Sequence, residues 1–378
     1  MSSLPVIYSA DYLKYDFGPG HPFTPARWEA LHDLISGLDL KINWVDATPC
    51  TDYHLLRVHD NEFVEAVANA SSNLTVPYAG FMGLATGDVP TFKGMHDASK
   101  VVCGGSLLAA DMVASGHQKR VLQLGGGLHH AMSDRASGFC VYNDLAVMIS
   151  GLRAKGFRVA YIDIDVHHGD GVQAIFYGDP EVLTVSLHES GEHLFPGTGF
   201  VDEIGKGDAK GMSVNVPLVP ETTDESYLEC FEAVVPDVLV RFEPDVLVVQ
   251  AGADAHNMDP LAHLCLSTHA YEKLFDRLIA LAESITGGRI VCTLGGGYAF
   301  DSTLRIWSML AYKLAGEDLP ENLPQAWLER WRQHIRNSGW HSWHDPLSVP
   351  ESSETNLHIR DANRSTTDRL KLHLIKAN

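Results

Sequence analysis

The feature that most constrains the fold of this chain is a series of short, largely apolar runs, each followed directly by a glycine-rich or acidic segment. Runs of four to six such residues are typical of strands buried on both faces, as in a parallel sheet. The sequence therefore predicts a buried sheet that includes the following strands: Val121–Leu124, Val159–Ile164, Val182–Leu187, Val246–Val249 and Ile290–Leu294.

Segments with helical periodicity lie between these runs. Asn143 is a suitable N-cap for a helix that continues through Leu152, and Gly156 is a suitable stop for it. The same spacing of apolar residues predicts helices over residues 97–115, 224–241 and 268–284. Strands that alternate with helices predict an α/β fold in which helices cover both faces of the sheet.

The domain organisation follows from composition along the 378 residues. No internal repeat and no Pro- or Ser-rich linker interrupts the chain before residue 315, so we expect residues 1–318 to form one domain. Four of the seven tryptophans follow Asp318, which indicates that residues 319–378 form an extension packed on that domain. From about residue 350 the extension is polar, and we expect that part to be a loose tail.

The overall charge limits the range of partners. A formal net charge of −20 argues against nucleic acid, because affinity for phosphates comes mainly from Lys and Arg. The charge is compatible with a cationic or lysine-bearing substrate, and solubility explains it equally well. No apolar run is long enough to span a membrane and the N-terminus has no signal-peptide pattern, so we expect a cytoplasmic protein. The six cysteines include no Cys-x-x-Cys pair, and we expect reduced thiols. The pattern gives no preference for an oligomeric state.

One predicted strand ends in the residues of a metal site, Asp163-Ile-Asp165-Val-His167-His168-Gly-Asp170. Because side chains alternate along a strand, Asp165 and His167 point the same way and can reach one cation together. Asp254, which follows the run ending at Val249, is the third ligand that we expect. Two carboxylates and one imidazole suit catalytic Zn²⁺, which needs three protein ligands and an open position; they would also accept Fe²⁺ or Co²⁺.

A glycine-rich turn carries a pair of histidines, His129 and His130, directly after residues 125–128. The three glycines let the backbone approach a ligand closely, and the absence of a following Lys-Ser or Lys-Thr argues against a phosphate loop. Two neighbouring imidazoles beside a metal are suited to accept and donate protons. Asp163 and Asp170 are available to orient them.

A second glycine turn, Gly295-Gly296-Gly297, precedes Tyr298. The hydroxyl of Tyr298 is a candidate hydrogen-bond donor to the oxygen of a tetrahedral intermediate. Taken alone, this turn is as often structural as catalytic, and so is the histidine pair.

Together these motifs resemble those of the zinc-dependent histone deacetylases. The resemblance runs from about residue 5 to residue 315 and is carried in order by Gly126-Gly127-Leu128-His129-His130, Ser137-Gly138-Phe139-Cys140, Asp163 to Gly171, Ser186-Leu187-His188, Phe195-Pro196-Gly197-Thr198-Gly199 and Gly295-Gly296-Gly297-Tyr298. Within the family, Tyr8-Ser-Ala-Asp-Tyr12 and the segment from His21 to Arg27 look most like the bacterial acetoin-utilisation deacetylases.

The resemblance implies a three-layer α/β/α arginase/deacetylase fold with a central, mainly parallel eight-stranded sheet. It also implies the roles of eight residues. Asp165, His167 and Asp254 match the zinc ligands, His129 and His130 the general acid/base pair, Asp163 and Asp170 their carboxylate partners, and Tyr298 the tyrosine that polarises the substrate carbonyl.

In the family an apolar tunnel guides acetyl-lysine to the metal, and the resemblance assigns its parts here. Phe139 and Phe195 match the aromatic walls of the tunnel, with Leu261 nearby. Gly138 matches a backbone acceptor for the substrate amide, and Asp88 matches a carboxylate at the rim. Arg27 matches a residue of the acetate-exit channel. A narrow apolar slot suits a neutral acyl-lysine, since a charged lysine would be costly to desolvate.

The resemblance further implies two structural potassium sites. The inner site matches Asp163, Asp165, His167, Ser186 and Leu187, and the outer site matches Phe176, Asp179, Val182 and Met212. Asp179 departs from the hydroxyl residue of the animal enzymes, so the match is weaker at the outer site.

The activity that the resemblance implies is hydrolysis of the acetyl amide of N6-acetyl-lysine in a protein or peptide, with release of acetate. The acetoin branch suggests an acetylated acyl-CoA synthetase as substrate. An acetylpolyamine amidohydrolase is an alternative with the same chemistry, although no large insertion is evident. An arginase-type ureohydrolase would need a second carboxylate two residues after Asp254, where this chain has His256. A non-enzymatic binding module would usually lack a ligand or the tyrosine, and all are present here.

Overall fold

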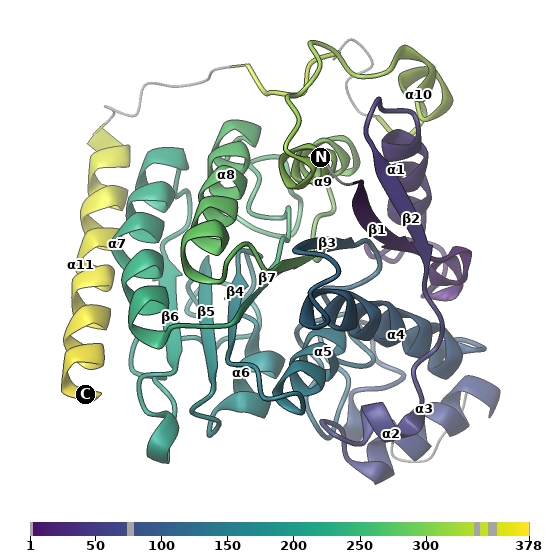
Figure 1. Cartoon of the computed structure of the whole chain (residues 1–378), viewed down its shortest axis with the longest axis horizontal. Helices are drawn as coiled ribbons and strands as arrows, with labels where there is room; N and C mark the ends of the chain where they lie inside the picture. Colours follow the sequence, from purple (N-terminus) through teal and green to yellow (C-terminus); the bar gives the residue numbers. More distant parts are fainter. Residues whose placement is uncertain (1–2, 74–78, 336–340, 347–353, 378) are drawn as a thin grey trace.

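A computed structural model describes residues 3–73, 79–335, 341–346 and 354–377. Its centre is one sheet of eight parallel strands in the order β2-β1-β3-β8-β7-β4-β5-β6 (Figure 1). The strands are β1 Leu4–Tyr8, β2 Ile42–Asp46, β3 Arg120–Gln123, β4 Val159–Asp163, β5 Val182–Glu189, β6 Ser213–Leu218, β7 Val246–Gln250 and β8 Ile290–Thr293. The predicted α/β fold with a central eight-stranded sheet is confirmed, and all of its strand pairs are parallel.

Helices cover both faces of this sheet. They are α1 Ala26–Ser36, α2 Asp52–Leu55, α3 Asn61–Asn73, α4 Met95–Ala114, α5 Asp144–Arg153, α6 Asp170–Phe176, α7 Asp224–Phe242, α8 Thr268–Ile285, α9 Phe300–Ala315, α10 Gln325–Arg330 and α11 Glu354–Ala377, with short 3₁₀ turns η1 Ala10–Lys14, η2 Ala79–Met82 and η3 Gly207–Ala209. Helices α1, α7, α8 and α9 share one hydrophobic core with the sheet, and α3, α4 and α5 share the other.

The alternation of side chains explains why the strands read as continuous apolar runs. In β7, Leu247 and Val249 belong to the core under α7 to α9, while Val246 and Val248 belong to the core under α3 to α5. All four are fully buried. A strand covered on both faces has no solvent side on which a polar residue would be favoured.

The four strands whose carboxyl ends carry the chemical motifs are neighbours in the sheet, in the order β3-β8-β7-β4. The turn after β3 leads to the histidine pair, and the turn after β8 leads to Tyr298. Because parallel strands end at the same edge of a sheet, their turns lie together there. The functional groups therefore come from turns on adjacent strands.

The first part of the C-terminal extension is joined to α1 by two indole groups. Trp327 in α10 donates its Nε1–H to the carbonyl oxygen of Ala30 at 2.9 Å, and Trp331 donates to Oδ2 of Asp33 at 2.9 Å. Both indoles are mostly buried. Apolar and hydrogen-bonded indole surface thus attaches this segment to the body of the molecule.

The loose tail expected from about residue 350 is wrong for residues 354–377, which form α11, a helix of 24 residues. This helix lies alongside α7 and over the edge strand β6 (Figure 1). Leu370 and Leu374, one helical turn apart, are buried against the body. The composition is polar because most of the other positions face solvent, and two leucines one turn apart are too few to signal a helix.

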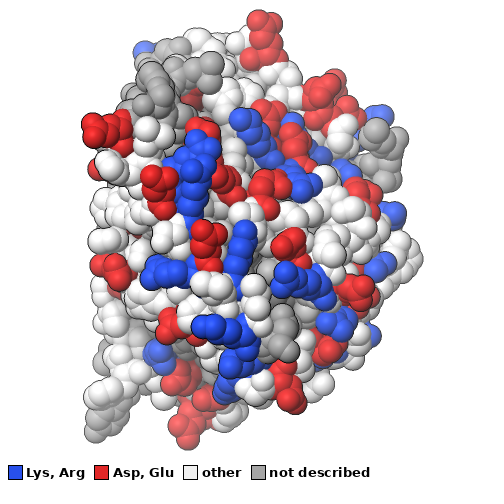
Figure 2. Space-filling view, turned by 90° about the vertical axis from the view of Figure 1, so that its left-hand side faces the viewer, with Lys and Arg blue, Asp and Glu red and all other residues white. Residues whose placement is uncertain are grey.

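Charged residues dominate the outer surface on the α11 side of the molecule, where both signs are intermixed (Figure 2). Arg360 contacts Glu225 and Glu229 on α7, and Arg364 contacts Glu229 at 2.7 Å. Half-exposed ion pairs of this kind contribute modestly to stability. Their main effect is to fix the register of α11 along α7.

None of the helices in the described ranges is both long and apolar enough to cross a membrane. The six cysteines are all free thiols, and five of them are buried. The free thiols agree with the expectation of reduced cysteines.

Candidate metal centre and catalytic groups

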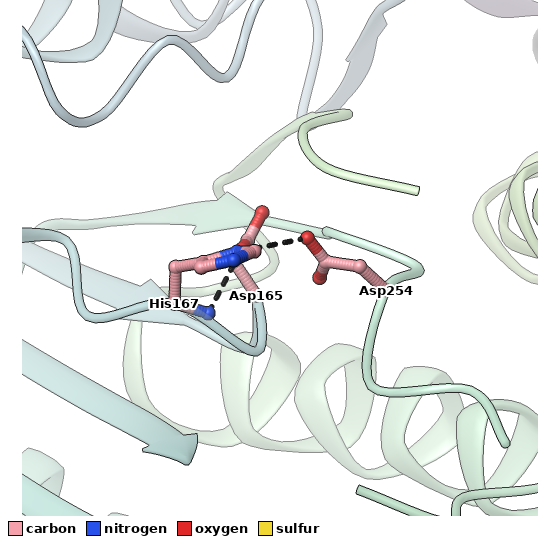
Figure 3. A group of neighbouring side chains, drawn as sticks. All are labelled: Asp165, His167 and Asp254. Atoms are coloured by element: carbon pink, nitrogen blue, oxygen red, sulfur yellow. Dashed lines mark hydrogen bonds and ion pairs between the residues drawn. The ribbon is translucent and has the colours of Figure 1, made fainter. Parts of the chain in front are cut away.

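Three side chains converge at the carboxyl ends of β4 and β7 (Figure 3). Nδ1 of His167 lies 3.1 Å from Oδ1 of Asp165 and 3.2 Å from Oδ2 of Asp254. One ligand atom from each residue falls within 4.8 Å of the others, and all three side chains are largely buried. The structure thus brings together the three residues that the sequence singles out as metal ligands.

Two glycines make room for the carboxylates. A Cβ atom at Gly296 would lie 1.8 Å from Oδ2 of Asp254, and one at Gly252 would lie 2.3 Å from Oδ2 of Asp165. Any side chain at these positions would displace a carboxylate. The glycines are therefore required by the close approach of backbone to the site.

Backbone and amide donors fix the orientation of both carboxylates. Oδ2 of Asp165 accepts hydrogen bonds from Nε2 of Gln250 at 2.7 Å and from the Gly296 amide at 2.8 Å. Oδ1 of Asp254 accepts from the Val166 amide at 2.9 Å. The sequence analysis did not single out Gln250. This residue is the last of β7, and nothing in its local sequence indicates a contact with Asp165 in the turn after β4.

The electrostatics of the three residues call for a cation. Burial raises the pKa of Asp254, and the neighbouring Asp165 carboxylate adds to this, so that its pKa is about 7. Two carboxylates held together away from water are stable as anions only when a positive charge neutralises them. Carboxylate and imidazole donors in a set of three fit a divalent metal with an open position.

The two histidines of the first glycine turn form a matched pair beside these ligands. Nδ1 of His129 lies 2.8 Å from Oδ2 of Asp163, and Nδ1 of His130 lies 2.7 Å from Oδ1 of Asp170. Their Nε2 atoms are 3.0 Å apart. Each carboxylate can accept a hydrogen bond from the Nδ1–H of its histidine. The Nε2 atoms of the two rings then face each other. Tyr161 also donates to Asp163 at 2.5 Å.

The two imidazoles have opposite pKa shifts. Burial lowers the pKa of His129, but Asp163 and Asp165 outweigh it and raise the pKa to about 9. Burial and the neighbouring His129 together lower the pKa of His130 to about 4. A cation held by Asp165 would cancel part of the field that raises the pKa of His129. The pair is therefore suited to hold one proton between two rings.

A buried carboxylate that sequence reasoning missed, Asp144, holds the turn before the histidines. It accepts hydrogen bonds from the amides of Gly127 and Leu128, the latter at 2.7 Å, and from the hydroxyl of Ser106 at 2.5 Å. Asn143 donates to the carbonyl oxygen of His129 at 3.1 Å. Asp144 lies 16 positions from Leu128, and Asn143 lies 14 positions from His129. The spacing of neighbouring residues therefore does not indicate these contacts.

Tyr298 lies at the end of the second glycine turn and lines the same cavity as the histidine pair. Its amide donates to Oδ2 of Asp259 at 2.7 Å, a contact that the sequence did not indicate. Arg27 is buried, donates to the carbonyl oxygen of Gly297 at 2.7 Å, and has its guanidinium 5.3 Å from the Tyr298 ring. Burial raises the pKa of Tyr298 well above its usual value, so its hydroxyl stays protonated and can donate.

A narrow cavity reaches these groups. Its lining includes His129, His130, Asp165, His167, Gly138, Phe139 and Tyr298. The rings of Phe139 and Tyr298 are 5.8 Å apart edge to face, and the ring of Phe195 lies 5.0 Å from that of His130. Aromatic rings therefore stand on both sides of the entrance to the metal ligands.

Phe139 has an unusual backbone, with φ at 67°. The hydroxyl of Tyr15 donates to its carbonyl oxygen at 2.7 Å and accepts from the Val141 amide at 2.9 Å. A non-glycine residue in this region needs outside support. Tyr15, which the sequence did not single out, provides it for this wall of the cavity.

The remaining residues of the expected tunnel lie farther out. Leu261 is half-buried, and its amide donates to Oδ1 of Asp259 at 3.0 Å; it is not part of the cavity lining. Asp88 is exposed, and its carbonyl oxygen lies 3.3 Å from Nε2 of His21, whose ring is 4.7 Å from that of Phe139. Asp88 is thus placed beside the entrance and not within it.

The motifs and the geometry agree with a match to a known family. A model of the histone deacetylase domain matches residues 21–314 of the chain. The chain belongs to the histone deacetylase family. The predicted resemblance to this family is confirmed.

Two curated members of the family have the same name. An acetoin utilization protein AcuC of Bacillus subtilis is 39% identical over 368 residues, covering 96% of this chain and 95% of the relative. An acetoin utilization protein AcuC of Staphylococcus aureus is 37% identical over 379 residues, covering 97% and 95%. The predicted likeness to the acetoin branch of the histone deacetylase family is also confirmed.

Solved structures of the family have the same fold. A crystal structure of a histone deacetylase homologue complexed with SAHA has a TM-score of 0.85 and 28% identity, covering 96% of this chain and all (100%) of the other. A homologue from Aquifex aeolicus has a TM-score of 0.83 and 28% identity. Membership of the histone deacetylase family implies a hydrolase that uses a metal ion.

The residues that resemblance assigns to potassium lie on and around β4 and β5. Asp163 pairs with Ser186 in the sheet register, and the Ser186 hydroxyl is 2.8 Å from Nδ1 of His188. Asp179 accepts from Nε of Arg153, the last residue of α5, at 3.3 Å and from the Glu181 amide in its own turn at 2.9 Å, so its carboxylate already has two partners. Both potassium sites of this histone deacetylase stay predictions.

Proposed function

We propose that this protein is a zinc-dependent deacetylase that hydrolyses the acetyl amide of N6-acetyl-lysine in proteins or peptides. One observation carries the proposal. Asp165 and His167 line a cavity whose lining also includes His129, His130 and Tyr298, and the third ligand residue, Asp254, lies 3.2 Å from Nδ1 of His167. Ligands, proton-transfer groups and an oxyanion donor are the parts that hydrolysis of an unactivated amide requires.

Zinc fits the donor set, and Fe²⁺ or Co²⁺ would fit it as well. When bound, the metal would polarise the acetyl carbonyl and lower the pKa of a water molecule. Asp165, His167 and Asp254 would hold it, with Gln250 orienting Asp165 through the 2.7 Å hydrogen bond.

The histidine pair moves protons in this proposal. With Nδ1 of each ring bound to a carboxylate, Nε2 of one ring accepts a proton from the attacking water, and Nε2 of the other delivers a proton to the departing lysine nitrogen. Their 3.0 Å separation lets a proton pass between them. Asp163 and Asp170 keep both rings in the orientation that the transfer needs.

Tyr298 serves the carbonyl end of the substrate. Its raised pKa keeps the hydroxyl protonated at neutral pH, so it can donate to the carbonyl oxygen as negative charge develops there. Asp259 holds the backbone of Tyr298, and the cationic Arg27 lies behind its ring. These contacts preorganise the donor, which limits the reorganisation required during the reaction.

The cavity favours a neutral acyl-lysine over a charged lysine. Phe139 and Phe195 provide apolar faces for the methylene chain. Gly138 lets the backbone pack closely on the His130 ring, because a Cβ at this position would lie 2.4 Å from Cδ2 of His130. A charged ammonium would lose its hydration among these rings without a partner. An acetylated acyl-CoA synthetase is the protein substrate that the likeness to the acetoin utilization proteins suggests.

Two alternatives share parts of this site. An acetylpolyamine amidohydrolase would use the same chemistry on a slimmer substrate. An arginase-type ureohydrolase would need a second metal near His256, but both ring nitrogens of His256 are engaged, Nε2 with Asp345 at 2.8 Å and Nδ1 with the Met258 amide at 3.2 Å. That engagement favours a single metal ion.

Metal analysis combined with turnover tests these alternatives. We expect one zinc per chain and a turnover of acetyl-lysine peptides that exceeds the turnover of acetylpolyamines and of longer acyl-lysines. The Asp254→Ala variant should bind no metal and show no turnover. Two metals per chain with urea release from arginine or agmatine would select the ureohydrolase, and faster turnover of acetylpolyamines would select the polyamine enzyme.

A further inference from the structure

A carboxylate from the C-terminal extension lies directly behind the candidate metal centre. Asp345 belongs to residues 341–346, outside the part of the chain that matches the deacetylase domain. It is 8% exposed. The proposed reaction gives this residue no role, yet its contacts are to the elements that carry the ligands and the tyrosine.

The first contact of Asp345 is with the loop that contains a metal ligand. Its Oδ2 lies 2.8 Å from Nε2 of His256, two residues after Asp254. The His256 ring is fully buried, and its Nδ1 accepts from the Met258 amide at 3.2 Å. The same loop continues to Asp259, whose amide donates to the His256 carbonyl at 2.9 Å. His256 is therefore the residue around which this loop folds.

The other contacts of Asp345 reach two helices. Its Oδ2 also accepts from the Thr268 amide at 2.8 Å, in the first turn of α8, while its own amide donates to the Thr268 hydroxyl at 2.8 Å. Its Oδ1 accepts from Nη2 of Arg305 at 3.0 Å. Arg305 is in α9, which begins two residues after Tyr298. One carboxylate thus joins the Asp254 loop, α8 and α9.

The path from Asp345 to the reacting groups is short. His256 shapes the loop in which Asp254 faces the metal ligands and Asp259 accepts from the Tyr298 amide at 2.7 Å. Displacing this loop would move a ligand and the oxyanion donor together. Small misplacements of catalytic groups are costly, because ligand geometry and hydrogen-bond alignment both deteriorate.

We propose that Asp345 is a positioning residue that holds the Asp254 loop and the Tyr298 turn in place through His256 and Arg305, so that residues 341–346 form part of the catalytic unit. This inference rests on the proposed function. Burial raises the pKa of Asp345, but the contact with His256 and the charge of Arg305 outweigh it and hold the pKa well below the usual range. The carboxylate is therefore an anion at neutral pH, which strengthens its hydrogen bonds.

The Asp345→Asn variant tests the proposal, because it keeps the size of the side chain and removes the charge and one acceptor. We expect metal affinity, measured by competition with a chromophoric chelator, to fall about tenfold, at the low end for partners of metal ligands. We expect kcat on an acetyl-lysine peptide to fall about tenfold as well, with KM within about twofold. The His256→Gln variant should reproduce both losses. The double variant should lose less than the product of the two single losses, since both substitutions break the same contact between Asp345 and His256.

Leu370→Ala is the matched control. Leu370 is fully buried in α11, in the same C-terminal extension but outside residues 341–346, and it packs on the body of the molecule. This variant should lower the unfolding midpoint and leave metal affinity and kcat unchanged. Equal losses in Leu370→Ala and Asp345→Asn would overturn the proposal, as would wild-type metal affinity and kcat in Asp345→Asn. If Asp345→Asn does not fold, the metal affinity and kcat of His256→Gln test the proposal in its place. Absence of any wild-type deacetylation would refute the proposed function alone, since metal affinity is measured without substrate.

Discussion

Asp165 illustrates how strongly each ligand depends on residues that never touch the metal. Its Oδ2 accepts from Gln250 and from the Gly296 amide, while its Oδ1 accepts from the His167 amide at 3.0 Å. Hydrogen bonds from three donors allow this carboxylate only one orientation. The spacing of Asp165 and His167 indicates the ligands, but two of the three donors come from β7 and from the turn after β8, which are distant in sequence.

At Tyr298, removal of the hydroxyl tests the role of the oxyanion donor. The Tyr298→Phe variant should lose about 100- to 1,000-fold in kcat, the effect of deleting such a donor in other hydrolases. Metal content should stay at the wild-type level, because Tyr298 is not one of the three ligand residues. Turnover of an acetyl-lysine peptide and metal analysis of the same sample provide the measurement. Wild-type kcat in this variant would remove Tyr298 from the mechanism.

Gly296 is the residue where the smallest change should have the largest effect on metal binding. In a Gly296→Ala variant the new Cβ would lie 1.8 Å from Oδ2 of Asp254, so the ligand has to move. We expect metal affinity to fall at least 100-fold and activity to be lost with it. Gly37→Ala is the control, because its Cβ would meet only backbone oxygens at 3.4 Å or more, in a helical conformation. Retention of metal by Gly296→Ala would show that the loop shifts without cost.

At the level of elements, an uninterrupted apolar run decided which strands the sequence could predict. β4 and β7 are central, fully buried and apolar. β6 is at one edge and includes Asn215 and Pro217, and β2 at the other edge has Trp44 36% exposed. Edge strands tolerate proline and polar residues because one side of their backbone lacks a partner strand. Their sequences therefore lack the signal that marks the centre of the sheet.

Helix α11 is attached to edge strand β6 by one buried amide. Asn363 accepts from the Val219 amide at 3.1 Å and donates to the hydroxyls of Thr222 and Ser226 at 2.8 and 2.9 Å. The Asn363→Ala variant leaves these buried groups without their partner and should lower the free energy of unfolding by about 2 kcal/mol. A urea titration measures the change, and kcat should stay unchanged because α11 is far from the cavity lining.

The control for α11 is Asp361→Ala. Asp361 is 75% exposed and lies 3.7 Å from Arg364, a surface pair that contributes less than about 1 kcal/mol. If both substitutions shifted the urea midpoint equally, the buried amide would not be the attachment point. If neither did, α11 would be docked too weakly to affect the stability of the body.

For the whole molecule, the sequence predicts the fold class and the ligand set because both depend on local patterns. Apolar runs mark the central strands, and the Asp-x-His spacing at the end of β4 marks two ligands of one cation. The supports of the site, Asp144, Gln250 and Asp345, depend on contacts between turns that are distant in sequence. Which turns meet follows from the strand order, and a single sequence does not specify that order.

Several buried histidines make the stability of the whole molecule depend on pH. Burial lowers the pKa of His59 and His130 to about 4 and that of His168 to about 3, while the pKa of His188 lies well below its usual value. Each is therefore neutral in the folded protein near neutral pH, whereas in the unfolded chain a histidine titrates near ~6.5. At a pH between the folded-state and unfolded-state pKa values, the unfolded state binds more protons than the folded state. Stability contributed by the neutral rings is complete above pH ~6.5 and declines as the pH falls towards 4.

His59 isolates this effect, because it is remote from the metal ligands and its two nitrogens have fixed roles. Its Nδ1 donates to the Met132 carbonyl at 2.9 Å, and its Nε2 accepts from the Asn143 amide at 3.0 Å, so a second proton would face an N–H group. In urea titrations from pH 6.5 down to 5, this ring should account for on the order of 1.5 kcal/mol of the lost stability, since one pKa unit corresponds to ~1.4 kcal/mol. His59→Gln should be less stable at pH 7 but show a correspondingly smaller loss on acidification. His117→Gln, at an exposed histidine, should follow the wild-type slope; a wild-type slope in His59→Gln as well would mean that His59 is not neutral in the folded protein.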